Sequence, residues 1–563
     1  MNNVILSPFL QTVIGLISFV IVAFGQPAWS GILGLLASVM GYALFWRVLL
    51  CYPKIKHRFF LGTVWFFSVQ MVQLSWLTSH PYFYIYFVQF LLSVYLGLQF
   101  GLLCLLIQPK LLSRFWCLLS IASIWTLFEW SRLFFLSGYT WNPAGLALTA
   151  SLYSLQMASI WGIYGLTFWV IFTNLLALRA WFSSRYILPW ACAAALPYIF
   201  GAIHLNVHLK NFEKHEGAPF NALLLQTAFP VEEIMDFSDK QSMIQYVLAE
   251  WETILKIAKK NGKKPIDLIA LPEFVVPFGT YTFVYPFDNV KELFLKILGP
   301  DSLAHLPPFE NHLAISYKTP KGVIWVVNNA FWAQAMANYF NAGVIVGLED
   351  AEDVSPEKRE YYSSAVYFKP QYDGTTPASE RYEKRVLLPM GEYIPFEFCR
   401  ELASKYGILG SFTPGQEAKV MPHSKAPFGV SICYEETFGD LMRENKQKGA
   451  EVLVNLTSDV WYPSSLLPRQ HLDHARLRTV ENGIPLVRAC NTGITCAIDS
   501  MGRVVDVLGG ETPAKVEWIA DSIRIEVPTY TYSTLYSKVG DKLILGISLF
   551  FTLIFLACLK YLL

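Results

Sequence analysis

Long apolar runs constrain the fold of this chain more than any other feature. Seven runs of about twenty mostly apolar residues lie within the first 205 positions, and an eighth lies at the end of the chain. A helix needs about 20 such residues to cross the hydrocarbon core of a bilayer. We therefore predict eight membrane spans, near residues 4–24, 28–50, 59–79, 82–107, 113–136, 153–178, 185–205 and 542–562.

The first run lacks a basic leader and a small-residue cleavage site, so we expect it to stay as an anchor. The seven runs are followed by a region rich in charged residues, although the whole chain is only 15% charged. Ordinary soluble domains contain about 25% charged residues. We predict three parts: residues 1–212 with seven transmembrane helices, a catalytic domain at 219–530, and residues 536–563 with the eighth helix.

The polar region contains short apolar bursts separated by helical stretches. Such bursts are typical of strands buried on both faces of a sheet, which predicts a layered α/β domain. The bursts lie at residues 222–225, 268–271, 343–346, 429–432 and 452–455.

Basic residues in alternate short loops indicate the orientation. Lysine and arginine concentrate in cytoplasmic loops of membrane proteins, and seven crossings from a cytoplasmic start place the polar region outside. Chemistry there must proceed without cytosolic ATP. The basic residues are Lys54, Lys56, Arg58, Lys110, Arg114, Arg179 and Arg185.

Charge and cysteine usage exclude several classes of protein. A net charge of +1 provides no basic field for nucleic acid. Nine cysteines without Cys-x-x-Cys spacing fit neither a disulfide scaffold nor a zinc module. His471 and His474 have a spacing that can serve a metal, but no third ligand accompanies them, so structural roles are favoured.

Three strand-end segments contain the groups that acyl transfer requires. Glu273 ends Ala-Leu-Pro-Glu, Lys384 ends Arg-Tyr-Glu-Lys, and Cys433 begins Cys-Tyr-Glu. Acyl transfer through a covalent intermediate needs a nucleophile, a base and a donor to the oxyanion. A neighbouring ammonium favours the thiolate, and a carboxylate removed from water acquires the raised pKa of a good base.

Each of these residues has an ordinary interpretation when taken alone. A lone cysteine is more often a small buried hydrophobe than a nucleophile, and Glu273 and Lys384 would usually be loop or surface charges. Their order along the chain favours catalysis. Glu392 either holds its loop by hydrogen bonds or touches substrate, and Tyr434 and Glu435 follow the thiol as supports.

This pattern resembles known families. The order Glu, Lys, Cys, with Leu-Pro-Glu closing one strand and Cys-Tyr-Glu following another, is similar to the nitrilase superfamily, whose fold is an αββα sandwich. Lys384 followed by Leu-Pro-Met-Gly-Glu-Tyr-Ile-Pro, between seven spans and one, resembles the apolipoprotein N-acyltransferase family. The resemblance implies a catalytic triad with Glu273 as general base, Lys384 as oxyanion stabiliser and Cys433 as nucleophile. It also implies Glu392, Tyr434 and Glu435 as supporting residues.

Two features of the membrane part have alternative interpretations. Glu129 and Arg132 lie three apart, which indicates either a functional interior or a paired helix anchor. By the resemblance Trp141 lines a lipid entry, although Tyr139 and Trp141 also fit an interfacial aromatic belt.

The activity implied by the resemblance is a ping-pong transfer at the outer, periplasmic side of a bacterial inner membrane. The donor is a phospholipid, the intermediate is a thioester, and the acceptor is the N-terminal diacylglyceryl cysteine of an apolipoprotein. We expect no metal or organic cofactor, because the triad accounts for each proton and charge. Departures from the family pattern are Met390 in place of Phe, Val386 in place of His, and Met235 near an expected Trp.

Two rival functions remain. A membrane-tethered amidase would use the same triad with water as the final acceptor. A transporter or lipid-binding protein would contain an inert nitrilase-like domain and form no acyl adduct.

Overall fold

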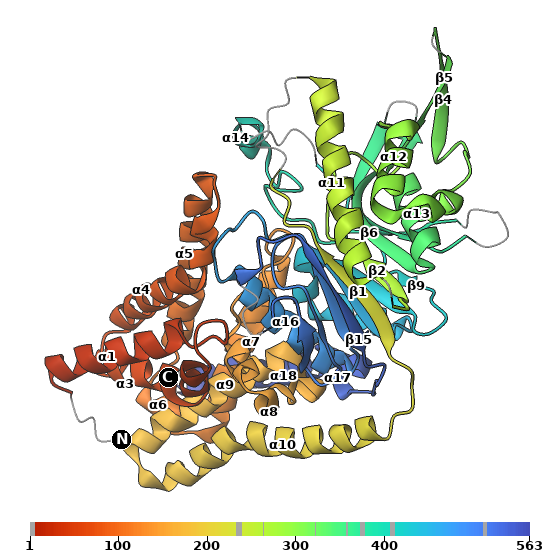
Figure 1. Ribbon diagram of the computed structural model, residues 1–563. Coiled ribbons are helices and arrows are strands. Elements are labelled where there is room, and N and C mark those ends of the chain that lie inside the picture. Colours follow the sequence, from red (N-terminus) through yellow and green to blue (C-terminus); the bar gives the residue numbers. More distant parts are fainter. Residues whose placement is uncertain are drawn as a thin grey trace. The chain divides into compact units, whose positions relative to one another are not determined.

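The computed structural model describes residues 6–231, 239–262, 264–320, 322–355, 358–371, 378–405, 411–510 and 515–562. Met235 therefore lies outside the described residues. The chain forms two compact units (Figure 1). The helical unit comprises Met1–His215, Tyr462–Gly483 and Tyr532–Leu563, and the α/β unit comprises Glu216–Trp461 and Ile484–Thr531.

The helical unit contains a helix within or overlapping each of the eight predicted spans. Among the described residues, four helices are long and apolar enough to cross a membrane: Gly31–Leu49, Tyr84–Cys104, Ala158–Phe182 and Ser184–Glu213. The apolar helices Pro8–Ala23 and Lys542–Cys558 are shorter. Crossing by all eight stays a prediction. The helices are α1 (Pro8–Ala23), α2 (Gly31–Leu36), α3 (Tyr42–Leu49), α4 (Ile55–Gln73), α5 (Tyr84–Cys104), α6 (Pro109–Leu112), α7 (Phe115–Ser131), α8 (Leu152–Leu155), α9 (Ala158–Phe182), α10 (Ile187–Glu213), α16 (Leu467–Asn482), α17 (Leu535–Val539) and α18 (Lys542–Leu562).

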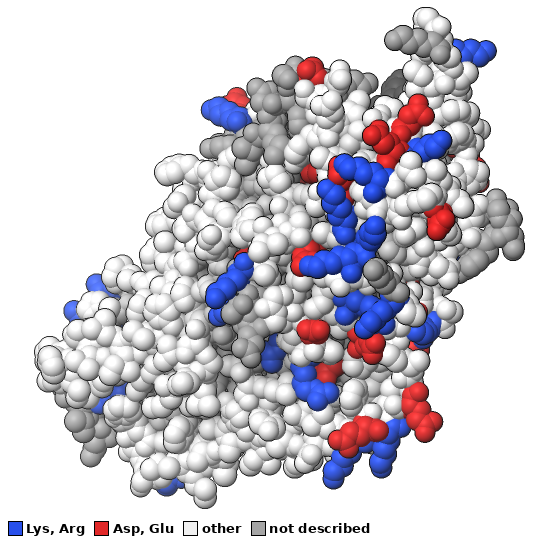
Figure 2. All heavy atoms as spheres, viewed as in Figure 1, with Lys and Arg blue, Asp and Glu red and all other residues white. Residues whose placement is uncertain are grey.

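Large apolar side chains lie on the outside of these helices, as expected where lipid is the solvent. Phe9 on α1 and Ile32 on α2 are each 78% exposed, and Leu188 on α10 is 72% exposed. In Figure 2 the charged side chains gather over the α/β unit, and the visible surface of the helical unit is almost free of them.

Glu129 is buried in the helical unit and joins three of its segments. Its carboxylate accepts hydrogen bonds from the indole of Trp125, the main-chain N–H of Ala144 and the hydroxyl of Thr167. The Arg132 guanidinium lies 3.9 Å away. These contacts support the interpretation of this pair as an internal anchor.

Helix α16 belongs to the helical unit, although we predicted residues 219–530 as one domain. Its sequence is polar, yet most of its side chains are buried. Arg478 and Glu481 form a fully buried ion pair of 2.7 Å. Glu481 also accepts the N–H of Ile163 at 2.9 Å, next to Gly162, where α9 is kinked and φ is +60°.

The α/β unit contains two six-stranded sheets and one small sheet. The first has the order β15-β1-β2-β6-β7-β8 and the second β14-β13-β12-β11-β10-β9. The strands of the first are β15 (Asp521–Val527), β1 (Phe220–Gln226), β2 (Leu268–Ala270), β6 (Gly343–Ser355), β7 (Lys358–Phe368) and β8 (Glu380–Glu383). Those of the second are β14 (Val504–Val507), β13 (Cys496–Ile498), β12 (Leu486–Cys490), β11 (Val452–Thr457), β10 (Phe428–Ile432) and β9 (Val420–Met421). The small sheet has β3 (Tyr285–Pro286), β5 (Gly322–Val327) and β4 (Ala314–Thr319).

Alternating side chains of the first sheet enter two cores, because successive residues of a strand point to opposite faces. Leu224 of β1 packs in one core with Val430 of β10 and Val454 of β11, which places the two large sheets face to face. Leu223 packs in the other core with Trp251. The helices of that second core are α11 (Lys240–Asn261), α12 (Phe287–Leu298) and α13 (Asn329–Phe340).

Helix α15 (Gly439–Gln447) packs on the second sheet, where the Cβ of a residue at Gly429 would come within 2.5 Å of Asn445. Helices, two sheets and a further helix give the predicted αββα layering. Strands lie at all five apolar bursts, so the prediction of a layered α/β fold is confirmed.

Candidate active site

Glu273 lies three residues after the end of β2, on a loop that runs along β6. The N–H of Leu271 donates to Ile345 O at 2.9 Å, and the N–H of Gly347 donates to Pro272 O at 3.1 Å. A Cβ at Gly347 would lie 2.6 Å from the Cα of Glu273, so only glycine allows this close approach. The Glu273 side chain is buried as a result.

Lys384 follows β8 and is also buried. Its main-chain N–H donates to Ser363 O at 2.8 Å, which continues the β7–β8 pairing by one residue. Its Nζ lies 2.8 Å from Glu273 Oε1 and 2.7 Å from Glu392 Oε1. A buried ammonium is held here between two carboxylates, as a buried charge requires.

Cys433 follows β10 with its backbone in the left-handed region, at φ +50°. A residue with a Cβ rarely adopts this conformation, and such strain is typical of functional sites. The amide of Asn455 donates to Cys433 O at 3.2 Å. The half-buried thiol lies within the electrostatic influence of Glu273 and Lys384, whose charges act on its pKa in opposite directions.

Glu392 makes hydrogen bonds within its own loop. Its Oε2 accepts the main-chain N–H of Leu388 at 2.7 Å, and this closes the loop that follows Lys384. Its Oε1 binds Lys384, so this carboxylate holds the loop and the ammonium together.

Glu435 joins the Lys384 loop to the Cys433 loop. One oxygen accepts the N–H groups of Arg385 and Val386 at 2.6 and 3.1 Å. The other accepts the N–H of Ile432 and the hydroxyl of Tyr382, both at 2.8 Å. A fully buried carboxylate therefore fixes the separation of two strand ends that belong to different sheets.

The remaining predicted residues lie further from these groups. Tyr434 is buried, with its ring 5.0 Å from that of Phe438. Trp141 belongs to the helical unit, where its ring lies 5.4 Å from each of His471 and His474 and 5.3 Å from Trp76. Within the described ranges, His, Cys, Asp and Glu side chains form no cluster of three that could hold a metal.

The electrostatics suit a neutral thiol beside a carboxylate base. Burial raises the pKa of Glu273, Lys384 opposes this shift and Glu392 adds to it. Burial lowers the pKa of Lys384, but the two carboxylates outweigh it and raise this pKa well above its usual value. Burial and the charge of Glu273 raise the pKa of Cys433 well above that of a free thiol, although Lys384 lowers it as expected. At rest the site therefore contains a thiol, which must transfer its proton when it attacks.

Sequence reasoning gave no role to two residues of the site. Tyr382 donates to Glu435, and Thr457 ends the strand next to that of Cys433, yet the sequence context of both resembles that of ordinary strand residues. Thr457 ends β11, beside β10 in a parallel pair. The adjacent carboxyl ends of parallel strands are the one signal that could have placed Thr457 near Cys433.

Comparisons with known proteins were made for the whole chain. The carbon-nitrogen hydrolase family model matches residues 235–516, and the model of the apolipoprotein N-acyltransferase N-terminal domain matches residues 18–176. An apolipoprotein N-acyltransferase of Chlamydia pneumoniae is 34% identical over 544 residues, which cover 93% of each chain. One from Chlamydia caviae is 34% identical over 555 residues, 95% of each chain. One from Geobacter metallireducens is 27% identical over 75% of this chain and 71% of its own.

Proposed function

Because this chain belongs to the apolipoprotein N-acyltransferase family, we propose that it transfers a fatty acyl group from a phospholipid, through a thioester on Cys433, to an apolipoprotein. The acceptor is the N-terminal diacylglyceryl cysteine. The observation that carries this mechanism is the position of Glu273, whose carboxylate lies 2.8 Å from the ammonium of Lys384 and whose charge acts on the thiol of Cys433.

The first half-reaction forms the thioester. The Sγ of Cys433 attacks the carbonyl carbon of the phospholipid ester while its proton passes to Glu273. The ammonium of Lys384 stabilises the negative charge that develops on the carbonyl oxygen. The carbon–oxygen bond then breaks, and Glu273 returns the proton to the departing oxygen of the lysophospholipid.

The second half-reaction transfers the acyl group to the amine. The amino group of the diacylglyceryl cysteine attacks the thioester carbon and loses a proton to Glu273. The carbon–sulfur bond breaks, and the proton returns to Cys433. The thioester retains the acyl-transfer potential of the ester, so no ATP is needed.

The supporting residues act on geometry in this mechanism. Glu392 positions Lys384, Glu435 sets the distance between the Lys384 and Cys433 loops, and Tyr434 anchors the residue after the nucleophile by packing on Phe438. We assign Trp141 to the path of the lipid donor. Its position among aromatic rings of the helical unit supports this assignment.

The chain is a membrane protein with several apolar helices. We propose eight spans, with the α/β unit on the periplasmic side of the bacterial inner membrane. The alternation of basic loops supports this orientation. Two of those arginines, Arg58 and Arg179, also bind main-chain carbonyl groups of the helical unit.

Intact-mass spectrometry of the detergent-purified protein incubated with phospholipid tests the mechanism. We expect an acyl mass that hydroxylamine removes from the wild type and that is absent from Cys433→Ala. The control is Cys192→Ser, which removes an exposed cysteine of the helical unit. If phospholipid binds and no adduct forms on the wild type, the thioester mechanism is wrong. Release of free fatty acid in place of transfer to a lipopeptide would favour the amidase.

A further inference from the structure

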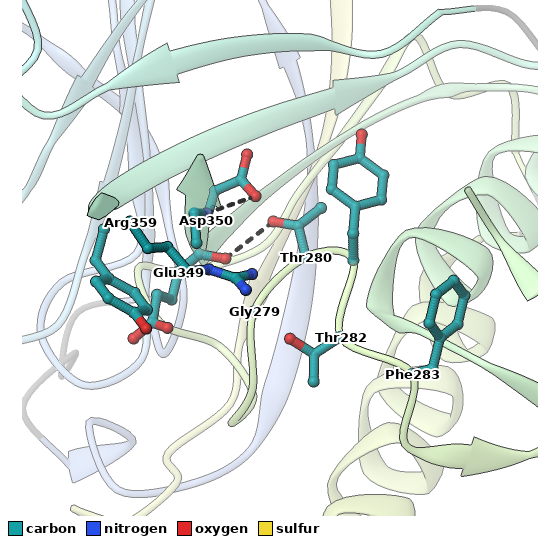
Figure 3. A pocket seen from close by; sticks show the side chains of 10 residues that line it. Gly279, Thr280, Thr282, Phe283, Glu349, Asp350 and Arg359 are labelled. Atoms are coloured by element: carbon teal, nitrogen blue, oxygen red, sulfur yellow. Dashed lines mark hydrogen bonds between the residues drawn. The ribbon is translucent and has the colours of Figure 1, made fainter. Parts of the chain in front are cut away.

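A polar cavity lies in the α/β unit beside the loop that contains Glu273. It has a volume of about 380 Å³ and is lined by residues 279–283 of that loop and by both strands of the β6–β7 hairpin (Figure 3). Its charged residues are Glu349, Asp350 and Arg359. None of these residues takes part in the chemistry proposed above.

The cavity continues a row of main-chain hydrogen bonds that begins at the active site. One edge of β6 pairs with the Glu273 loop: Val275 N–H donates to Gly347 O at 3.0 Å, and Thr280 N–H donates to Glu349 O at 2.8 Å. Main-chain groups of a strand point to the same edge at every second residue. The next groups on this edge belong to Ala351 and Asp353.

These next positions form an open strand edge. In the described part of the chain, no other strand or loop pairs with Ala351 or Asp353 on the side away from β7. The N–H of Ala351 meets only the side chain of the neighbouring Asp350, at 2.9 Å. An open edge beside a pocket is the arrangement in which an extended peptide adds to a sheet as a further strand.

The charges of the cavity suit a peptide with polar side chains. Asp350 is already held by Arg381 at 2.7 Å. The Glu349 carboxylate forms no ion pair or hydrogen bond with the described residues, although the charge of Arg359 acts on it. Arg359 lies 3.9 Å from Asp353 and 6.0 Å from the centre of the Tyr361 ring. Both charged groups line the cavity, where an incoming chain can meet them together with the hydroxyl of Thr282.

The spacing links this edge to the reacting amine. Ala351 lies four residues beyond Gly347, which packs against Glu273, and at about 3.3 Å per residue this is roughly 13 Å. An extended peptide covers that distance in about four residues.

We propose that the edge of β6 at Ala351 and Asp353, with Glu349 and Arg359, binds the extended peptide that follows the N-terminal cysteine of the acceptor. The inference rests on the proposed function, because it assumes an acceptor whose amine reacts at Cys433. The open strand edge favours a peptide over a lipid headgroup, which has no main chain to pair.

Ala351→Pro tests the proposal, because proline removes the outward N–H and is tolerated on strand edges. Two acceptors are compared: a diacylglyceryl-cysteine lipopeptide of ten residues and one of two residues. We expect the KM for the long acceptor to rise about tenfold, as for the loss of one or two hydrogen bonds. The KM for the short acceptor and the rate of thioester formation stay at wild-type values. Ala351→Ser keeps the main-chain N–H, so we expect its KM for the long acceptor to stay at the wild-type value.

An equal KM for the long acceptor in the Pro and Ser variants would overturn the proposal, as would an equal rise for both acceptors. If Ala351→Pro fails to form the thioester, the double variant Glu349→Gln with Arg359→Gln replaces it. We expect its KM for the long acceptor to rise about threefold and its KM for the short acceptor to stay unchanged. An unchanged KM for the long acceptor would overturn the proposal. Failure of the proposed function is distinct, because the wild type would then form no thioester.

Discussion

Glu392 holds the ammonium of Lys384, with 2.7 Å between Glu392 Oε1 and Lys384 Nζ, and Glu273 binds the same group. Two carboxylates therefore share one buried ammonium, and the negative charge of Glu392 contributes to the raised pKa of Glu273. Glu392 therefore affects both the position of the Lys384 ammonium and the basicity of Glu273.

Replacement of Glu392 tests this coupling. We expect Glu392→Gln to slow thioester formation about 100-fold, because a displaced ammonium misses the oxyanion. We also expect the acidic limb of the pH–rate profile to move to lower pH, because one negative charge near Glu273 is lost. Glu397→Gln is the control, since Glu397 is exposed and forms a surface ion pair with Arg400. An unchanged acidic limb in Glu392→Gln would contradict the coupling.

The pH dependence of the wild type follows from the shifts at the site. The base must be unprotonated, so activity falls as the pH drops through the pKa of Glu273. Because this pKa is raised, the pH at which half of the activity is lost lies above the ordinary glutamate pKa of about 4.3. The raised pKa of Lys384 keeps the ammonium charged up to at least about pH 10. Stopped-flow measurement of lysophospholipid release between pH 4 and 10 checks both limbs.

The reactivity of the thiol provides an independent test. Cys433 should react with iodoacetamide more slowly at pH 7 than a free cysteine, because its pKa is raised. Glu273→Gln removes a charge that raises this pKa, so alkylation should become faster while acyl transfer falls by about 10²- to 10⁴-fold. A Cys192→Ser background removes an exposed competing thiol. If both rates fall together, Glu273 acts as a structural residue and not as the base.

Glu435 should matter for stability as well as for rate. In Glu435→Gln an amide N–H₂ replaces an acceptor that faces main-chain N–H groups, and at least one buried donor loses its partner. We expect a loss of about 1 to 3 kcal/mol in the free energy of unfolding, measured by thermal or denaturant unfolding in detergent. Glu444→Gln, which breaks a partly exposed ion pair with Arg385, should cost at most about 1 kcal/mol. Equal losses of stability in Glu435→Gln and Glu444→Gln would contradict the role of Glu435 in joining the two loops.

Trp141 distinguishes the lipid path from an aromatic belt. If it lines the path, Trp141→Leu should slow thioester formation from phospholipid vesicles about tenfold and leave transfer from the preformed thioester unchanged. The matched control is Trp181→Leu, at a Trp that is 48% exposed on α9. Equal rates in the two variants would favour the belt.

The order of the site along the chain was predictable because strand ends are marked by apolar bursts that stop at polar residues. Lys384 and Cys433 each follow a strand directly, and Glu273 lies three residues after the end of β2. The contacts of Glu435 were not predictable, because a Glu two residues after a thiol has no periodicity that shows which N–H groups it meets. Helix α16 was not assigned to the helical unit for a related reason. Its burial depends on ion pairs such as Arg478–Glu481, whereas hydropathy detects only apolar burial.

The position of α16 in the helical unit affects the order in which the protein can be made. The helices up to α10 are synthesised before any residue of the α/β unit. Glu481, which binds the N–H of Ile163 at the kink of α9, is synthesised more than three hundred residues later. This contact therefore stays unmade until most of the α/β unit has been synthesised. The final packing of the kink is a late step, and truncation after α10 would leave the kink without its partner.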